Sequence, residues 1–545
     1  MMPHASVHDV FQASAARTPR AEFLFTEPVT AAAYGIAAGA MRWGDAAAQI
    51  GHLRTAYAQA GYGHGHRVGL LLENRPAFIL HWLALNALGV SVVPINADLR
   101  SAELAYLIGH SEIGLAVTLP GRAADLRAAA GQARVALATM GPDAAVPPAQ
   151  TPAPRAHEPV GADTECGLLY TSGTTGRPKG CILSNAYFLR AGQWYAGLDG
   201  LCRIRPDAER VITPLPLTHM NALAFSTMVV LVAGGCLVQL DRFHPQTWLA
   251  SARASGATIA HYLGVMPAML LSAPPSAADR EHALRWGFGA GVERKNHGPF
   301  EERFGLPLIE AWAMTETGAA ACIIANREPR LVGTNCFGRQ EDFVETRLVA
   351  EDGSDAGVDA PGELLVRSAG NDPRRHFFCG YLKDDEATRA AWADGWFHTG
   401  DLVRRDAGGN FFFIDRKKNV IRRSGENISA VEVESVLNQH PAVQASAVAA
   451  TPDPVRGDEV LACIVVRAHA DAGQRAQIAA SIVEHALAQL AYYKAPGYVA
   501  FVDALPLTPS QKIQRGQLRE LAQALPGQRH CIDTRALKKR PAAPA

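Results

Sequence analysis

Tyr170-Thr-Ser-Gly-Thr-Thr-Gly-Arg-Pro-Lys-Gly180 lies between two short apolar runs, Cys166-Gly-Leu-Leu-Tyr170 and Cys181-Ile-Leu183. Apolar runs of this length predict buried strands when turn residues bound them. The segment holds several hydroxyls, three glycines and one lysine within eleven residues. Glycines let backbone N–H groups approach phosphate oxygens, hydroxyls donate further hydrogen bonds, and Lys179 adds a mobile positive charge. The pattern predicts a phosphate-binding loop between two core strands, although a plain Gly/Thr turn has the same composition.

This loop differs from the Walker A loop of kinase-type NTPases. Counted from Gly173, the Walker pattern needs a second glycine where this chain has Pro178. A kinase-type NTPase is therefore disfavoured.

Length and charge limit the class of protein. The chain has 545 residues, more than one hydrophobic core usually holds, so at least two domains are expected. Its 52 Lys and Arg are balanced by 52 Asp and Glu, and 48% of its residues are apolar. This balance favours neither nucleic acid nor an anionic membrane as a partner. We expect a multidomain globular protein that recognises its partners locally.

Several features predict a cytoplasmic location. The nine cysteines include no C-x-x-C pair, which is typical of reduced thiols rather than disulfides or a zinc site. The first residues have neither a basic start nor an apolar core, so no secretory signal is visible. The longest apolar stretch, Ala77 to Ile95, is interrupted by His81, Asn86, Gly89 and Pro94. It predicts a buried helix followed by a buried strand, not a membrane span.

Composition also marks two boundaries. Residues 142–159 hold six prolines and predict a surface linker. A second boundary is expected near Asp415-Arg-Lys-Lys418, where an aromatic strand ending at Ile414 gives way to a basic stretch. Beyond it, Ser429 and Glu432 have capping-box spacing and predict a helix start, and a strand is expected at Val443 to Ala449.

Five further motifs follow the Gly/Thr-rich loop along the chain. They are Trp312-Ala-Met-Thr-Glu316, Gly395-Trp-Phe-His-Thr-Gly-Asp401, Asp415-Arg416, Ser424-Gly-Glu426 and Pro509-Ser-Gln-Lys512. Together, and in this order, they resemble the adenylate-forming superfamily of acyl-CoA synthetases, peptide-synthetase adenylation domains and luciferases. The resemblance spans roughly Gly65 to Leu518. It implies an α/β fold, with a large N-terminal domain of β-sheets flanked by helices and a small mobile α+β C-terminal domain. Residues 1–417 would form the first and 418–545 the second, with Lys418 at the hinge.

The resemblance also implies a reaction and its partners. ATP and a small carboxylic acid would give an acyl-adenylate with release of pyrophosphate, and the acyl group would pass to coenzyme A with release of AMP. A carboxylate and a triphosphate must then meet, so Mg²⁺ and cationic side chains are needed to offset their repulsion. The protein is a possible homodimer.

Site residues are carried over from the matching motifs. Glu316 matches the metal-binding glutamate, Thr315 a phosphate-binding hydroxyl, and Lys512 the lysine that bridges the acid and the α-phosphate. Gly425 would leave room for pantetheine, His219 matches a position that gates the acyl pocket, and Ala313 lies at the expected carboxylate pocket. Nucleotide contacts are implied for Thr171, Ser172, Gly173, Thr174, Thr175, Gly176, Lys179, Gly289, Ala290, Gly291, Trp312, Asp401 and Arg416.

Three positions depart from the common pattern. Trp312 stands where Tyr is usual, Ala313 where Gly is usual, and Gln511 where Gly usually precedes the lysine. The first two add bulk near the carboxylate pocket, which predicts a short or polar acid rather than a long fatty chain. Leu271-Ser-Ala-Pro-Pro-Ser276, Arg423-Ser-Gly-Glu-Asn-Ile-Ser429 and Val93-Pro-Ile-Asn96 are most similar to the crotonobetaine/carnitine:CoA ligase branch, so carnitine-like acids are candidates.

Three alternatives share these motifs. A free-standing adenylation enzyme would load a carrier protein instead of coenzyme A, and a luciferase would use the same first step. A catalytically inactive nucleotide-binding protein belongs to another class, and Gln511 beside the essential lysine prompts it. The intact set of Glu316, Asp401, Arg416 and Lys512 argues against that last interpretation.

Overall fold

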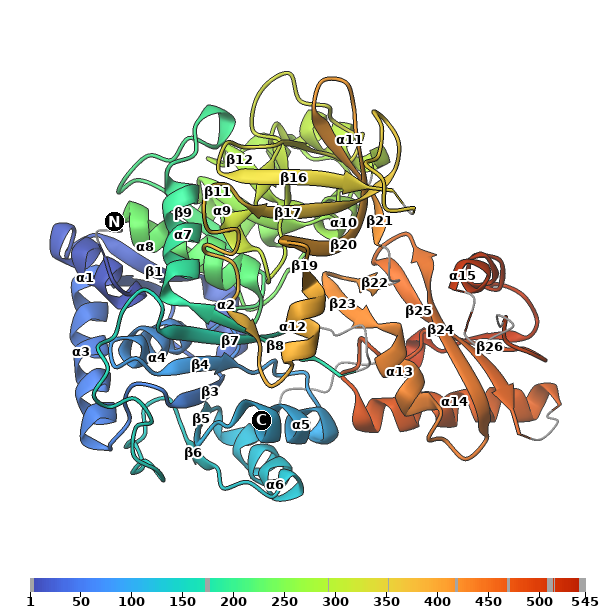
Figure 1. Ribbon diagram of the computed structural model, residues 1–545, viewed down its shortest axis with the longest axis horizontal. Coiled ribbons are helices and arrows are strands. Elements are labelled where there is room, and N and C mark those ends of the chain that lie inside the picture. Colours follow the sequence, from blue (N-terminus) through green and yellow to red (C-terminus); the bar gives the residue numbers. More distant parts are fainter. Residues whose placement is uncertain are drawn as a thin grey trace.

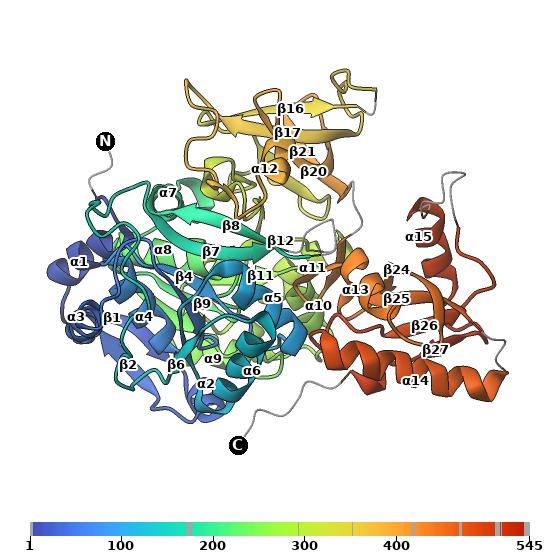
Figure 2. The ribbon, with the colours of Figure 1, turned by 60° about the horizontal axis from the view of Figure 1, so that its bottom comes forward.

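The chain folds into a large N-terminal part and a smaller C-terminal part, both of mixed helix and sheet, as a computed structural model shows (Figure 1). The structure describes residues 4–171, 177–292, 294–350, 352–416, 420–467, 471–506, 513 and 515–538. Figure 2 shows a third group of strands, which includes β16 (Val344–Val349) and β17 (Gly362–Ser368), raised above the rest of the N-terminal part. The expected fold class is confirmed.

The first sheet of the N-terminal part contains the strands on either side of the Gly/Thr-rich loop. β7 (Glu165–Thr171) and β8 (Lys179–Ser184) pair antiparallel, as the apolar runs predicted. Strands β3, β4, β5 and β6 pair in parallel, and β4 joins them to β7. The sheet order is β18 (Gly380–Tyr381), β8, β7, β4 (Ser91–Pro94), β3 (Arg67–Leu71), β5 (Leu115–Thr118) and β6 (Ala138–Met140).

The second sheet contributes residues of β11, β12 and β13 to the wall of the cavity described below. Its central strands pair in parallel, and nearly every residue in them is buried, as expected for strands covered on both faces. The order is β14 (Ile323–Ile324), β13 (Leu308–Trp312), β12 (Trp286–Ala290), β11 (Ile259–Leu263), β9 (Arg210–Thr213), β10 (Cys236–Gln239), β1 (Glu22–Thr26) and β2 (Gly39–Arg42).

Helices cover these two sheets. The core helix α4 contacts α1 and α3, and α1 also contacts α7 and α8. The helices of the N-terminal part are α1 (Val7–Arg17), α2 (Pro28–Tyr34), α3 (Trp43–Gln59), α4 (Pro76–Asn86), α5 (Ser101–Ser111), α6 (Ala123–Ala133), α7 (Asn185–Ala196), α8 (Thr227–Ala233), α9 (Trp248–Ala254), α10 (Val265–Leu271), α11 (Arg294–Phe304) and α12 (Asp385–Ala391). Shorter turns are η1 (Pro120–Arg122), η2 (Gly200–Cys202), the π-helical η3 (Asn221–Ser226), η4 (Ala277–Arg280) and η5 (Gly318–Ala320).

The third sheet follows the second along the chain. Its order is β15 (Cys336–Arg339), β21 (Asn410–Arg416), β20 (Trp396–Arg405), β17 and β16, and β19 (Trp392–Ala393) pairs with β20. Burial along β20 alternates, because one face of this sheet packs inward and the other faces solvent.

The C-terminal part has its own hydrophobic core, built from residues 421–501 and a second cluster that reaches Leu525. Its sheet order is β23 (Glu426–Ser429), β22 (Val420–Arg423), β25 (Gly457–Val466), β26 (Tyr498–Phe501) and β27 (Cys531–Asp533), and β24 (Val443–Asp453) pairs with β25. Its helices are α13 (Ala430–Leu437), α14 (Ala472–Gln489), α15 (Arg515–Ala524) and the short η6 (Arg535–Leu537). The proposed hinge residue Lys418 lies outside the described residues.

Local predictions agree with these elements. The apolar stretch from Ala77 to Ile95 forms α4 and β4, and the proline-rich residues 142–159 contain neither helix nor strand. The helix predicted after Ser429 is α13, and the strand predicted from Val443 is longer than expected and ends at Asp453. In the part of the chain that is described, no helix is both long and apolar enough to cross a membrane.

Candidate active site

A large cavity lies where parallel strands of the second sheet end. β9, β11, β12 and β13 run in parallel, so their carboxyl ends meet at one edge of the sheet. Open α/β sheets bind ligands at such edges. The cavity has a volume of about 1840 Å³ and is lined from both the N-terminal and the C-terminal parts of the chain.

The predicted adenine-binding segment closes one wall of this cavity. Gly289, Ala290 and Gly291 follow each other at the end of β12, and all three line the cavity. A Cβ on Gly289 would overlap the carbonyl oxygen of Tyr262, so only glycine fits there. Gly291 has a φ of 80°, in the left-handed region that favours glycine.

A buried carboxylate holds this segment in place. Glu310, on the neighbouring strand β13, accepts hydrogen bonds from the Gly291 amide (2.9 Å) and the Tyr262 hydroxyl (2.8 Å). Burial raises the pKa of Glu310 above its ordinary value. Sequence reasoning missed this residue, and its signal was a charged residue inside an otherwise apolar strand, because a buried charge needs partners.

Trp312 and Asp401 meet at the cavity wall. The indole Nε1 of Trp312 donates a hydrogen bond to Asp401 Oδ2 at 2.9 Å, and both side chains are buried. The structure thus brings together the residues expected to contact adenine and ribose, although they lie 89 positions apart in sequence. Their contacts with a nucleotide stay a prediction.

The predicted metal ligand Glu316 lies on the same wall. The residue is 6% exposed, and its Oε1 accepts a hydrogen bond from the Tyr381 hydroxyl at 2.9 Å. Thr315 also lines the cavity, and its carbonyl oxygen accepts a hydrogen bond from the Tyr187 hydroxyl at 2.9 Å. Tyr381 carried no motif and was missed.

Lys179 lies beside Tyr381 and Asp384. Its ammonium group lies 4.8 Å from the centre of the Tyr381 ring and 3.7 Å from Asp384. Because Tyr381 also holds Glu316, the predicted phosphate-binding cation and the predicted metal ligand share one neighbour.

No group of three or more metal-binding side chains occurs among the residues that the structure describes. A single carboxylate nevertheless suits Mg²⁺, which usually takes one or two protein carboxylates, several waters and the substrate phosphates. Glu316 at the cavity wall fits that requirement.

The structure describes only part of the predicted phosphate-binding and ribose-binding residues. Thr171 is described and lines the cavity at the end of β7. The structure describes the backbone of Arg416 on β21, while its side chain lies outside the described set. Also outside it are Ser172, Gly173, Thr174, Thr175, Gly176, Gln511 and Lys512.

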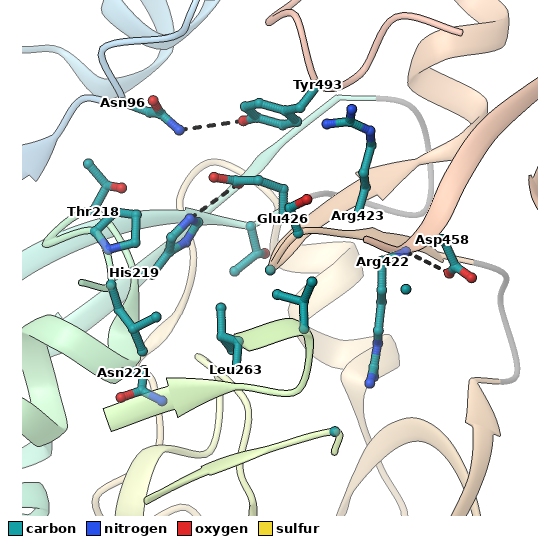
Figure 3. A pocket seen from close by; sticks show the side chains of 18 of the residues that line it. Asn96, Thr218, His219, Asn221, Leu263, Arg422, Arg423, Glu426, Asp458 and Tyr493 are labelled. Carbon is teal, nitrogen blue, oxygen red and sulfur yellow. Dashed lines mark hydrogen bonds and ion pairs between the residues drawn. The ribbon is translucent and has the colours of Figure 1, made fainter. Parts of the chain in front are cut away.

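The hairpin of β22 and β23 brings the C-terminal part into the cavity (Figure 3). Gly425, at its turn, has a φ of 89° and lies against Leu263 of β11, where a Cβ would overlap the Leu263 side chain. The next residue, Glu426, forms an ion pair with His219, with 3.3 Å between Oε2 and Nε2. The predicted thiol-path glycine and the predicted gating histidine therefore lie beside each other.

This ion pair shifts both titrations. Burial alone would lower the pKa of His219, but the charge of Glu426 outweighs that effect and raises it. Burial alone would raise the pKa of Glu426, but His219 and further cationic and hydroxyl neighbours lower it. Pairing thus favours the charged form of each group.

A second contact between the two parts of the chain lies nearby. Asn96 Nδ2 donates a hydrogen bond to the Tyr493 hydroxyl at 3.4 Å, as Figure 3 shows. Lys494 lies 2.7 Å from Glu103 of α5 and 2.8 Å from Glu432 of α13, and each of the three side chains is at most 10% exposed. Nothing in the local sequence marks Lys494, because its partners are distant along the chain.

Two family models match the chain. Residues 11–378 match the AMP-binding enzyme model, and residues 432–512 match the AMP-binding enzyme C-terminal domain. The chain belongs to the AMP-binding enzyme family. The resemblance inferred from the motifs is confirmed.

Characterised relatives of this AMP-binding enzyme include CoA ligases. It is 33% identical to the sulfoacetate–CoA ligase of Cupriavidus necator over 492 residues, which cover 88% of this chain and 92% of that protein. It is 29% identical to the crotonobetaine/carnitine–CoA ligase of Shigella flexneri over 489 residues, which cover 86% and 91%.

Solved structures of AMP-binding enzymes are similar along most of the chain. A malonyl-CoA ligase in a ternary complex with methylmalonyl-CoA and AMP is 27% identical, with a TM-score of 0.71, and the match covers 89% of this chain and 96% of that one. The o-succinylbenzoate CoA synthetase of Bacillus subtilis, with a TM-score of 0.78 at 24% identity, shares the fold over 94% of this chain and 98% of its own.

Proposed function

We propose that this AMP-binding enzyme is an ATP-dependent carboxylic acid:CoA ligase. It joins an acid to the α-phosphate of ATP, releases pyrophosphate, and then passes the acyl group to the thiol of coenzyme A with release of AMP. The observation that carries the proposal is the position of Gly425. This glycine lines the same cavity as Gly289 and Glu316, so a thiol that passes it reaches the place where the adenylate would form.

The nucleotide contacts follow from the geometry of the cavity. Adenine would lie beside Gly289, Ala290 and Gly291, and no atom lies within 4 Å of the place that a Cβ on Gly291 would take. Asp401, held by Trp312, suits the ribose hydroxyls, because a carboxylate accepts two hydrogen bonds. Arg416 is the proposed second ribose contact.

The phosphates would lie against the Gly/Thr-rich loop and Lys179. Glu316 would hold Mg²⁺, which supplies charge neutralisation between the two anionic reactants. Tyr381 orients the Glu316 carboxylate through its hydroxyl. Lys512 would bridge the acid and the α-phosphate as a stabilising charge rather than as a base.

Residues 1–417 and 418–545 are the proposed domains, and Lys418 the proposed hinge. The two half-reactions need different groups at one cavity, so rotation of the small domain would exchange Lys512 for Gly425. The protein is proposed to be cytoplasmic and to form a homodimer. Size-exclusion chromatography with light scattering would report the oligomeric state.

The proposed acid is short or polar. Trp312, Ala313 and Glu316 all line the cavity, and the added bulk of the first two would narrow the carboxylate site. A carnitine-like acid and a small sulfonated acid are the first candidates, because the relatives named above carry such substrates in their names.

An acid panel scored by CoA-dependent AMP release tests the proposal. We expect short polar acids to give AMP and an acyl-CoA thioester without any carrier protein. AMP release that needs a carrier protein would favour the free-standing adenylation enzyme. Pyrophosphate exchange at background level with every acid would favour the inactive nucleotide-binding protein.

A further inference from the structure

A buried histidine lies behind the cavity wall. His261, on β11, is fully buried, and its ring stacks on Tyr195 with 5.5 Å between ring centres. Phe288 lies on it as well, at 5.1 Å. Burial lowers the pKa of His261 to about 3, so the ring is neutral at physiological pH. A neutral imidazole has one N–H donor and one acceptor nitrogen.

The neighbours of His261 determine which nitrogen carries the hydrogen. The Tyr195 hydroxyl lies 2.8 Å from Nε2, and burial raises the pKa of Tyr195 well above its ordinary value, so the phenol keeps its proton. Within the described residues, this hydroxyl has no other hydrogen-bond partner. It therefore donates to Nε2, and the hydrogen of His261 must lie on Nδ1.

The Nδ1–H group in turn orients Asn221. Nδ1 lies 2.8 Å from Asn221 Oδ1 and 2.8 Å from Ser226 Oγ. Because Nδ1 is a donor, the side chain of Asn221 must present its carbonyl oxygen to His261. Its NH₂ group is then turned away from His261, and it makes no hydrogen bond within the described part of the chain.

Asn221 lines the cavity. Figure 3 shows it below His219 and beside the end of β11 that carries Leu263. It begins the π-helical turn η3, in which the Thr227 amide bonds back to the Ala222 carbonyl oxygen. Single π-helical turns are frequent at functional sites, because the extra residue re-aims a side chain.

Besides the polar Thr218 and His219, the cavity wall near Asn221 includes apolar side chains (Figure 3). Phe225, Met266 and Phe288 line it and are nearly fully buried. An N–H group that loses water without gaining an acceptor carries a desolvation penalty. An apolar acid that covered the Asn221 amide would therefore bind worse than an acid that offers it an oxygen.

We propose that Asn221 is a specificity-determining residue and that His261 is its positioning residue. The Asn221 NH₂ group donates a hydrogen bond to an acceptor oxygen on the acid, carried a few atoms from the reacting carboxylate. The substrate class is then a short acid with a hydroxyl, oxo or sulfonate oxygen. A bare quaternary ammonium offers the amide no acceptor. The inference rests on the proposed ligase function, because it concerns the acid used in that reaction.

Acids of equal shape and different polarity provide the test. Sulfoacetate, 3,3-dimethylbutanoate and glycine betaine share a branched head and a one-carbon spacer, but carry an acceptor, an apolar group and a cation. Pairs of straight-chain acids with a hydroxyl or a methyl group at one position extend the series. The readout is kcat/KM for pyrophosphate release, taken as a ratio within each set. We expect an acceptor-bearing acid to exceed its isosteres by about tenfold or more, the scale of one hydrogen bond.

Variants of Asn221 should change the ratio of kcat/KM between an acceptor-bearing acid and its isostere. Asn221→Leu should bring this ratio close to one. Asn221→Asp keeps an acceptor for His261 Nδ1 and replaces the NH₂ group by an anionic oxygen, so preference should shift toward glycine betaine. A ratio unchanged in Asn221→Leu would overturn the proposal.

Tyr195→Phe tests the positioning role. It removes the donor to Nε2, so the His261 hydrogen and the Asn221 amide are no longer fixed, and the ratio should fall severalfold. Tyr57→Phe is the matched control. The Tyr57 hydroxyl makes a similar buried contact, 2.7 Å from His81 Nδ1, and neither residue lines the cavity. Equal ratios in the two variants would contradict the role of His261, whereas a loss of stability alone would affect both acids of a pair equally.

Failure of the inference and failure of the ligase function are distinguishable. If no acid gives CoA-dependent AMP release, the proposed function is wrong. If acids are turned over and none with an acceptor is preferred to its isostere, the function stands and the assignment of Asn221 is wrong.

Discussion

A substitution of Lys512 should affect one of the two proposed half-reactions much more than the other. Lys512 would let two anions meet, and loss of one preorganised stabilising group usually lowers a rate by about 10²-fold or more. We therefore expect Lys512→Ala to lower pyrophosphate exchange by at least ~10²-fold and to affect thioester formation from supplied acyl-adenylate much less. Lys383→Ala is the control, because Lys383 is a partly exposed lysine that pairs with Glu112. Equal damage to both steps would contradict the assigned role.

The ion pair of His219 and Glu426 predicts a pH dependence. Pairing raises the pKa of His219 above its ordinary 6.5 and lowers that of Glu426 below 4.5. Its stabilisation of this arrangement is therefore complete between about pH 4.5 and 6.5, and is lost as pH rises through the raised pKa of His219 or falls through the lowered pKa of Glu426.

Glu426→Gln isolates that dependence. Without the carboxylate, burial should leave the pKa of His219 below its ordinary value, as histidine NMR would report. The ratio of wild-type to Glu426→Gln thiolation rates should fall as pH rises above neutrality, and the ionisation of the coenzyme A thiol cancels in this ratio. A ratio independent of pH would show that the pair does not stabilise the thiolation arrangement.

At the scale of elements, the hairpin of β22 and β23 determines how close the C-terminal part approaches the cavity. A leucine at Gly425 would overlap Leu263 and also require a positive φ. We expect Gly425→Leu to block thiolation and to leave pyrophosphate exchange largely intact. Gly409→Leu is the matched control, because Gly409 has a similar φ of 80° and a Cβ there would meet no atom within 4 Å. Unimpaired acyl-CoA formation by Gly425→Leu would remove this glycine from the thiol path.

At the scale of the whole molecule, one buried ionic cluster joins the two parts of the chain. Burial alone would lower the pKa of Lys494, but Glu103 and Glu432 together raise it, so the lysine stays charged. Breaking a buried pair by removing one partner typically costs about 3–5 kcal/mol, because the remaining charge is left without compensation. We therefore expect Lys494→Met to slow single-turnover thiolation at least about tenfold more than it slows pyrophosphate exchange.

Glu103→Gln refines this test. It breaks only the contact between the two parts, because Glu432 and Lys494 both belong to the C-terminal part. Glu112→Gln is the control, since Glu112 makes an exposed contact with Lys383 that should contribute little. If Glu103→Gln and Glu112→Gln have the same effect on thiolation, the cluster does not hold this arrangement.

Local sequence alone was sufficient for elements with strong periodicity and for residues inside ordered motifs. The apolar run at Ala77 to Ile95 had to form buried elements, because exposing it would be unfavourable in water. Gly425, Glu316 and Trp312, which line one cavity, could be proposed as site residues because each lies inside a motif whose spacing is local. The family assignment followed from the order of those motifs.

Tertiary structure decided which distant residues meet. Glu310 of β13 contacts Gly291 at the end of the neighbouring strand β12, Lys494 contacts Glu103 across the two parts of the chain, and His261 of β11 contacts Asn221 of η3. Each of these groups is polar and buried, so it must find partners, but burial itself arises only when sheets and helices pack. The local sequence contains the residue types for such contacts. The energy that pairs them depends on a fold that brings positions up to 397 residues apart within hydrogen-bond distance.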